Sequence, residues 1–123
     1  MKRVIGIGGV FLRCKDVERS REWYSRHLGI PLESWGAQFN HKDDQHPEAY
    51  SLLSFFKQDA SYFEPSTSGF MLNLRVADLD ALVVELRKEG VELIGEPVAE
   101  AYGKFAWVLD PDGNKIELWE QGK

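Results

Sequence analysis

The chain has 123 residues, of which 43% are hydrophobic and 28% are charged, and its formal net charge is −5. This length suits one domain that buries roughly two-thirds of its unfolded surface. The acidic balance argues against a nucleic-acid-binding surface, and no apolar run reaches the length of a membrane span. The single cysteine, Cys14, excludes an internal disulfide. We therefore expect a cytoplasmic domain without nucleic-acid or membrane partners.

Three glycines near the start, Gly6, Gly8 and Gly9, invite comparison with a dinucleotide-binding loop. That fingerprint needs a third glycine at the right spacing and a helix that opens directly on the loop. Here the chain continues from Val10 to Cys14 with alternating apolar residues, which is typical of a strand. We predict a strand at this position instead of a phosphate-binding loop.

The same short pattern occurs in both halves of the chain. Asp16 and Asp78 each open a helical stretch that ends at a glycine, Gly29 or Gly90, and each helix follows an alternating strand. The apolar positions of the first helix, Trp23, Tyr24 and His27 among them, are interpreted as core packing. Further strands are predicted at residues 33–39 and 50–56 in the first half, and at 92–94 and from 105 onward in the second.

This internal repeat predicts an α+β fold built from two tandem βαβββ modules. Module 1 spans about residues 1–63, a hinge covers 64–69, and module 2 spans about residues 70–123, all within one domain. One module leaves a sheet face uncovered, so the two are expected to pair.

The stretch from Phe105 to Glu120 predicts a β-hairpin around the turn Asp110-Pro111-Asp112-Gly113. Counting outward from that turn sets Val108 opposite Ile116 and Trp107 opposite Glu117. One face is then apolar, and the other carries Phe105, Trp107, Glu117 and Trp119. A carboxylate among three aromatic side chains marks the candidate site.

The repeat, a helix that starts at Asp and ends in Leu-Gly, and the closing motif Asp-Pro-Asp-Gly-Asn-x-Ile-Glu resemble the vicinal oxygen chelate superfamily. That group includes glyoxalase I, bleomycin-resistance proteins, extradiol dioxygenases and fosfomycin-resistance proteins. The resemblance covers essentially the whole chain. It implies that the paired modules curl a mixed sheet into an open cup, within one chain or across a homodimer, and a homodimer is expected here.

The metal-dependent members place one ligand at each of four related strand positions. The matching positions here are Glu117, Gly9, Met71 and Ser54. Because a divalent ion needs several oxygen or nitrogen ligands at once, we predict no metal site and no cofactor. A divalent metal remains the alternative if the alignment is shifted or a partner chain supplies ligands.

One other stretch, residues 40–46, holds two histidines and two aspartates. Its spacing does not converge ligands as a helix or knuckle would, and polar clusters of this kind are common in turns. We interpret it as a solvated hairpin loop.

The residues that we expect to line the cup share the face of Glu117 or its equivalent in the other strands; they are Phe11, Arg13, Met71, Asn73, Arg75, Trp107, Glu117 and Trp119, with Trp35 and Phe39 as further candidates. Such an aromatic pocket with few polar groups is typical of a small-molecule site. Glu117 is a counter-charge for a cationic ligand, a general base, or the partner of Arg13 or Arg75 in a salt bridge, with Asn73 satisfying the remaining acceptor.

Two functions follow from these residues and the resemblance. The first is a metal-independent small-molecule-binding protein, similar to the bleomycin-resistance branch, whose organic ligand lies around Glu117. The alternative is a glyoxalase-like lyase or isomerase, with Glu117 as acid and base on a carbon next to a carbonyl.

Overall fold

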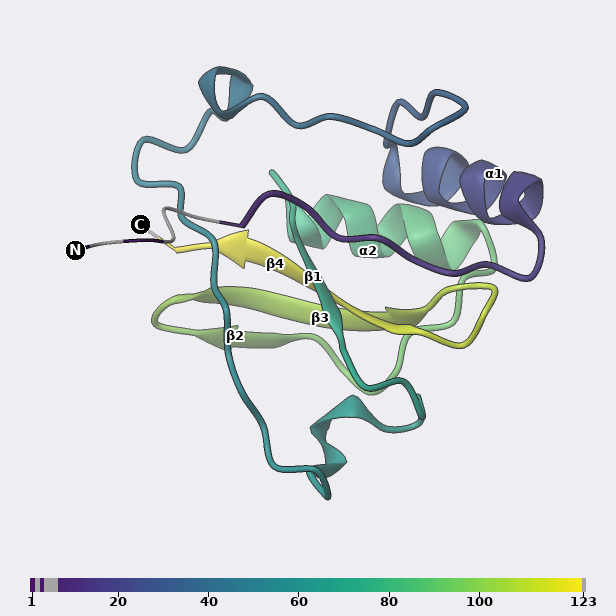
Figure 1. Cartoon of the computed structure of the whole chain (residues 1–123). Helices are drawn as coiled ribbons and strands as arrows, with labels where there is room; N and C mark the ends of the chain where they lie inside the picture. The colour runs from purple at the N-terminus through teal and green to yellow at the C-terminus, as the bar shows by residue number, and fades with distance from the viewer. Residues whose placement is uncertain (2, 4–6, 123) are drawn as a thin grey trace.

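The computed structural model describes residues 1, 3 and 7–122 and shows a mixed α+β fold (Figure 1). Two helices and a four-stranded, open, curled sheet form its regular part, which confirms the predicted fold class. In chain order the elements are α1 (Val17–Leu28), η1 (His41–Asp43), η2 (Ser61–Phe63), β1 (Leu72–Arg75), α2 (Leu79–Lys88), β2 (Val98–Glu100), β3 (Gly103–Leu109) and β4 (Lys115–Gln121).

The sheet has the strand order β1-β4-β3-β2, so α2 lies in the connection from β1 at one edge of the sheet to β2 at the other edge. β1 runs parallel to β4, while β3 is antiparallel to both of its neighbours. The predicted hairpin register is confirmed, because Val108 lies opposite Ile116 and Trp107 lies opposite Glu117. Gly113, with φ of 80°, closes the turn in a backbone conformation that favours glycine.

Both predicted helices are present and are capped as expected. Asp16 accepts a hydrogen bond from the backbone N–H of Arg19, and Asp78 accepts one from the backbone N–H of Ala81. Gly29 ends α1 in the left-handed conformation, with φ of 66°.

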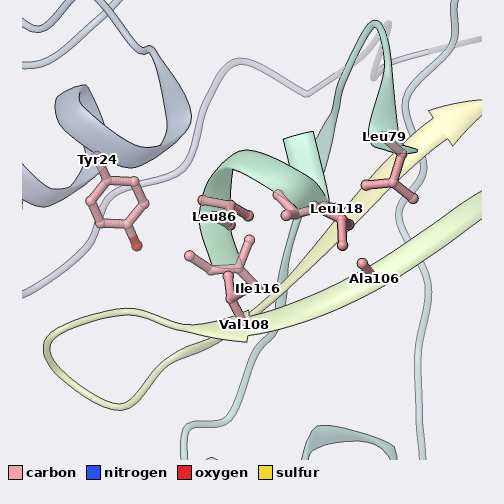
Figure 2. Close-up of a cluster of buried hydrophobic side chains, with 8 residues drawn as sticks. Tyr24, Leu79, Leu86, Ala106, Val108, Ile116 and Leu118 are labelled. Carbon is pink, nitrogen blue, oxygen red and sulfur yellow. The ribbon is translucent and has the colours of Figure 1, made fainter. Parts of the chain in front are cut away.

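The core lies between the helices and the apolar face of the β3–β4 hairpin (Figure 2). α2 contributes Leu79, Val83 and Leu86, and the hairpin contributes Ala106, Val108, Ile116 and Leu118. Tyr24 of α1 joins this cluster, and Trp23 packs against it. Burial of these apolar side chains is the main source of stability in the fold.

The strands predicted in the first half are not formed. Residues 10–14 and 50–56 have no partner strand, and within 33–39 only Glu33 and Gly36 form an isolated bridge. A strand needs the backbone hydrogen bonds of a neighbour, and alternating residues alone do not supply them. The alternation survives only in part: Leu12 and Cys14 are partly buried and Phe11 and Arg13 are exposed, but Val10 is exposed as well.

A smaller correction concerns the strand after α2. The predicted strand at 92–94 is reduced to a bridge between Leu93 and Val108, and the regular strand β2 starts at Val98. Gly95, with φ of 71°, lies between the Leu93–Val108 bridge and strand β2, and interrupts the pairing of this stretch with β3.

The segment of residues 44–63, called the covering segment below, crosses the sheet face opposite the helices (Figure 1). Its side chains and backbone contact Arg75, Trp107, Glu117, Trp119 and Gln121. The aromatic face of the hairpin is therefore partly covered by the first half of the same chain.

Two further expectations concern the glycine-rich start of the chain and membrane-spanning helices. Gly6 of the glycine-rich start lies outside the described residues, and no helix opens directly on Gly8 and Gly9, since α1 begins at Val17. Among the helices described, none combines the length and apolar character that a membrane crossing requires.

Candidate ligand-binding site

Glu117 lies at the centre of the sheet face that the covering segment crosses. Glu117 is only 9% exposed. Trp107 Nε1 donates a hydrogen bond to Oε2 at 2.9 Å, and Asn73 Nδ2 donates one to Oε1 at 2.7 Å. Both donors stand directly opposite Glu117 in the sheet, on β3 and β1 respectively. The sheet register itself thus holds the carboxylate in place.

The third donor to Glu117 comes from outside the sheet. Tyr62, in the short helix η2 of the covering segment, donates its hydroxyl hydrogen bond to Glu117 Oε2. Burial and the neighbouring Glu117 carboxylate raise the pKa of Tyr62, so this phenol keeps its proton. Three donors that carry no formal charge therefore satisfy a carboxylate on an aromatic surface.

Aromatic rings surround this carboxylate on β3 and β4. Phe105 stacks on Trp119 with ring centroids 6.1 Å apart and on Trp107 at 6.5 Å. Tyr50 of the covering segment meets Trp119 edge to face at 5.4 Å. The arrangement offers flat, apolar contact area beside one charged acceptor, as small-molecule sites commonly do.

Lys115 places a cationic group beside the rings of Tyr62 and Trp107. Its ammonium lies 5.2 Å from the ring centroid of Tyr62 and 5.9 Å from that of Trp107. Lys115 Nζ also donates to the backbone carbonyl of Tyr62 at 2.6 Å. Burial lowers the pKa of Lys115, while the nearby carboxylates of Glu117 and Glu64 oppose that shift.

The structure brings together only part of the residue set predicted from the sequence. Asn73 and Trp107 each donate a hydrogen bond to Glu117, and Trp119 belongs to the adjoining aromatic stack. Met71 is partly buried, beside β1, and no hydrogen bond or ring contact joins it to Glu117 within the described residues.

Three other predicted residues point elsewhere. Phe11 is 98% exposed and Arg13 is exposed, so neither lies in the group around Glu117. Trp35 and Phe39, the further candidates, are also exposed. Arg75 forms its ion pair with Asp44 of the covering segment, which excludes the predicted salt bridge between Arg75 and Glu117 in this structure.

Sequence reasoning missed Tyr62 and Lys115. Tyr62 lies just before the hinge, in a stretch without periodicity, and its contact with Glu117 joins residues far apart in the chain. Lys115 had a detectable signal, because residues two apart on a strand share a face and Lys115 precedes Glu117 by that spacing.

The polar loop at residues 40–46 is tied to the sheet. Asp44 pairs with Arg75, and this hydrogen bond lowers the pKa of the Asp44 carboxyl. A ring nitrogen of His46 lies 3.0 Å from the carbonyl of Gly122, and Gln121 donates to the carbonyl of Glu48 at 2.7 Å. Across the described residues no three His, Cys, Asp or Glu side chains come together as a metal-binding group.

A separate cleft of about 590 Å³ lies beside α1 and the end of α2. Trp23, His27 and Glu89 line it, and His27 Nδ1 lies 2.9 Å from a carboxylate oxygen of Glu89. None of the residues around Glu117 belongs to its lining.

The comparisons with known proteins now identify the family. A model of the Glyoxalase/Bleomycin resistance protein/Dioxygenase superfamily matches residues 6–118. The chain belongs to this superfamily. The resemblance inferred from the repeat and the closing motif is thereby confirmed. No curated protein matches the chain.

Solved structures of other proteins share the fold. TnmS3, an antibiotic-binding protein from Streptomyces sp. CB03234, is 26% identical over 97% of this chain and 100% of its own, with a TM-score of 0.58. A glyoxalase/dioxygenase from Nostoc punctiforme is 19% identical, covers 100% of this chain and 99% of its own, and has a TM-score of 0.57. A member from Sphaerobacter thermophilus is 22% identical, with coverages of 88% and 90% and a TM-score of 0.52.

Proposed function

We propose that this superfamily member is a metal-independent protein that binds a small organic ligand on the aromatic sheet face around Glu117. The observation that carries the proposal is the buried Glu117 carboxylate, oriented by Trp107 and Asn73 from the two neighbouring strands. A fixed acceptor beside a stack of rings suits an organic ligand that offers a flat surface and a hydrogen-bond donor.

The residues at the metal positions of the superfamily do not fit a divalent ion. Of Gly9, Ser54, Met71 and Glu117, only Glu117 carries a carboxylate, and Gly9 and Ser54 are exposed. Both oxygens of Glu117 already accept hydrogen bonds from the protein. An ion at this point would have to displace those donors and would gain a single strong ligand, which favours a function without metal.

The likeness to TnmS3 supports the same proposal. That protein is described as antibiotic-binding, and it is 26% identical to this chain over nearly the full length of both. We extend to this chain only the class of activity, namely binding of an organic compound.

The second candidate is a lyase or isomerase in which Glu117 moves a proton on a carbon next to a carbonyl. Lys115 favours keeping it, since an ammonium whose pKa is lowered by burial, close to a carboxylate, can serve as the matching acid. For Glu117 to act as the base, Tyr62 must first leave its carboxylate, because the phenol occupies Oε2.

The variant Glu117→Gln tests the two candidates, with Glu100→Gln on the exposed strand β2 as the matched control. A library of flat organic compounds is screened by thermal shift, and calorimetry measures the affinity of each hit. We expect Glu117→Gln to weaken binding at least tenfold and Glu100→Gln to leave it unchanged. Hits that bind both variants equally would overturn the proposed site. Turnover of a carbonyl compound that falls by orders of magnitude in Glu117→Gln, with affinity kept, would favour the enzyme.

Metal independence has its own test. Metal-stripped protein is titrated with Ni²⁺, Zn²⁺, Mn²⁺ and Fe²⁺ while its melting temperature is followed. We expect no saturable rise at any ion. A rise that disappears in Glu117→Ala would place an ion at this carboxylate and refute the assignment.

We also propose that the protein is a cytoplasmic homodimer. Within the covering segment, Leu52, Leu53 and Phe55 are 61%, 74% and 89% exposed, an unusual concentration of bare apolar side chains. A second copy that covers them would remove this surface from water. Sedimentation of the wild type and of Leu53→Lys/Phe55→Lys distinguishes a dimer from a monomer, and a monomeric wild type would refute the proposal.

A further inference from the structure

The three donors to Glu117 differ in how firmly they are held. Asn73 and Trp107 belong to strands that pair with β4, and each stands opposite Glu117 in the register. Tyr62 belongs to η2 in the covering segment, and no ladder of backbone hydrogen bonds joins η2 to the sheet in the part of the chain described. Tyr62 is also 40% exposed. Of the three donors, Tyr62 is the one that an incoming molecule can replace without opening the sheet.

The surroundings of the Tyr62 ring define a compartment for one aromatic ring. Phe56 stacks on it with centroids 5.7 Å apart and planes 7° apart, and Trp107 meets it edge to face at 6.2 Å. The ammonium of Lys115 lies 5.2 Å from the ring centroid, a position that attracts the negative face of an aromatic ring. The hydroxyl of the ring reaches Glu117.

We propose that the covering segment occupies the ligand site with its own phenol, and that the ligand is a neutral hydroxylated aromatic compound that displaces Tyr62. The inference rests on the proposed function and names its ligand class. The ligand ring takes the space between Phe56, Trp107 and Lys115, and the ligand hydroxyl donates to Glu117 in place of the tyrosine hydroxyl.

Charge and hydrogen bonding exclude the neighbouring ligand classes. An organic cation would meet the ammonium of Lys115, which already lies over the rings of Tyr62 and Trp107. A phenolate or carboxylate would face the charge of Glu117 without a proton to share. An aromatic ether would leave Glu117 Oε2 with Trp107 as its one donor among these three, and sites built to pair with a hydroxyl reject analogues that lack it.

The test compares 2-naphthol with 2-methoxynaphthalene, which has the same ring system and no donor. Calorimetry is run on the wild type, on Tyr62→Ala, and on Tyr62→Ala combined with Glu117→Gln, and the indole N–H signal of Trp107 is followed by NMR. We expect 2-naphthol to bind the wild type at least tenfold more tightly than the ether. In Tyr62→Ala its affinity should rise about tenfold further, because the internal competitor is gone.

The combined variant should lose most of the preference for the hydroxyl. Equal affinities for 2-naphthol and its ether in Tyr62→Ala would overturn the inference, as would an unchanged preference in the combined variant. If Tyr62→Ala does not fold, the inference is tested on the wild type. Equal affinities for 2-naphthol and its ether, or a Trp107 indole N–H signal that 2-naphthol does not shift, would overturn it.

The outcome also separates this inference from the proposed function. A compound without a hydroxyl whose affinity depends on Glu117 would keep the proposed function and refute the phenolic ligand class. Failure of every compound to show a dependence on Glu117 would refute both.

Discussion

The turn of the hairpin is fastened to α1 through the carboxylates of Asp110 and Asp112, and removing a single oxygen atom, the hydroxyl of Tyr24, tests the connection through Asp110. Asp110 is 6% exposed and accepts hydrogen bonds from the backbone N–H groups of Asp112 and Asn114, from Asn114 Nδ2, and from Tyr24 Oη at 2.7 Å. Tyr24→Phe removes only the last of these and keeps the ring in the core cluster.

The size of the effect follows from the charge on the acceptor. A hydrogen bond to a charged group contributes about 1.5–3 kcal/mol, against about 1 kcal/mol for a neutral pair. Three donors remain on Asp110, so the carboxylate stays satisfied and the lower half of that range applies, about 2 kcal/mol. For a domain of this size, 1 kcal/mol changes the melting temperature by about 4 °C, so we expect a loss of about 8 °C.

The pH dependence gives a second signature of the same contact. Burial, together with the hydrogen bond and the charge of Asp110, raises the pKa of Tyr24 above its ordinary value of 10.0. A raised pKa in the folded state contributes stability that is full below pH 10 and is lost as pH rises above it. The difference between wild type and Tyr24→Phe should therefore shrink above pH 10, by about 1.4 kcal/mol per pH unit.

Urea unfolding followed by circular dichroism at pH 7, 9 and 10.5 measures both quantities. Tyr102→Phe is the matched control, since Tyr102 is 61% exposed and its hydroxyl makes no hydrogen bond to the described residues. A loss below about 0.5 kcal/mol in Tyr24→Phe, or a difference that does not narrow above pH 10, would refute this account of the contact.

Three further predictions concern the sheet and the covering segment. At Gly103, with φ of 142°, an added Cβ would lie 2.4 Å from a backbone oxygen of β4. Gly103→Ala should therefore lower the free energy of unfolding by about 3 kcal/mol. Gly69→Ala is the control and should change it little, because its Cβ would meet nothing within 4 Å. A stable Gly103→Ala protein would contradict the close approach of β3 and β4. Arg75→Ala should speed tryptic cleavage within the covering segment several-fold, because the pair with Asp44 is lost. The lowered pKa of Asp44 predicts the same loosening in the wild type as pH falls below 3.8, and equal cleavage rates at pH 3 and pH 7 with an acid-stable protease would contradict it.

The second half of the fold could be predicted from the sequence because its signals are local. The turn at Asp110 to Gly113 fixes the register of the hairpin, and with it the pairing of Trp107 with Glu117. The capping aspartates, Asp16 and Asp78, mark both helix starts for the same reason, since a cap acts on backbone groups within three residues.

The first half could not be predicted in the same way. Residues 50–56 have the composition of a strand, but whether they join a sheet depends on a partner strand, which local pattern does not reveal. In the structure the covering segment is instead fastened by individual side chains, Asp44 to Arg75 and Tyr50 to Trp119. Tyr62 reaches the site through the same segment, so its role had no local signal.

The site also differs from the sequence prediction in which groups stabilise the Glu117 carboxylate. The prediction weighed a cationic ligand, a general base, and a salt bridge to Arg13 or Arg75 with Asn73 on the remaining acceptor, and the contact with Asn73 is present. Arg75 is instead paired with Asp44, and Glu117 is satisfied by an amide, an indole and a phenol. When Tyr62 leaves, Oε2 keeps only the hydrogen bond from Trp107, and a ligand that donates a hydrogen bond to this oxygen restores the lost contact. The displaceable donor, Tyr62, is therefore the residue whose chemistry the ligand has to reproduce.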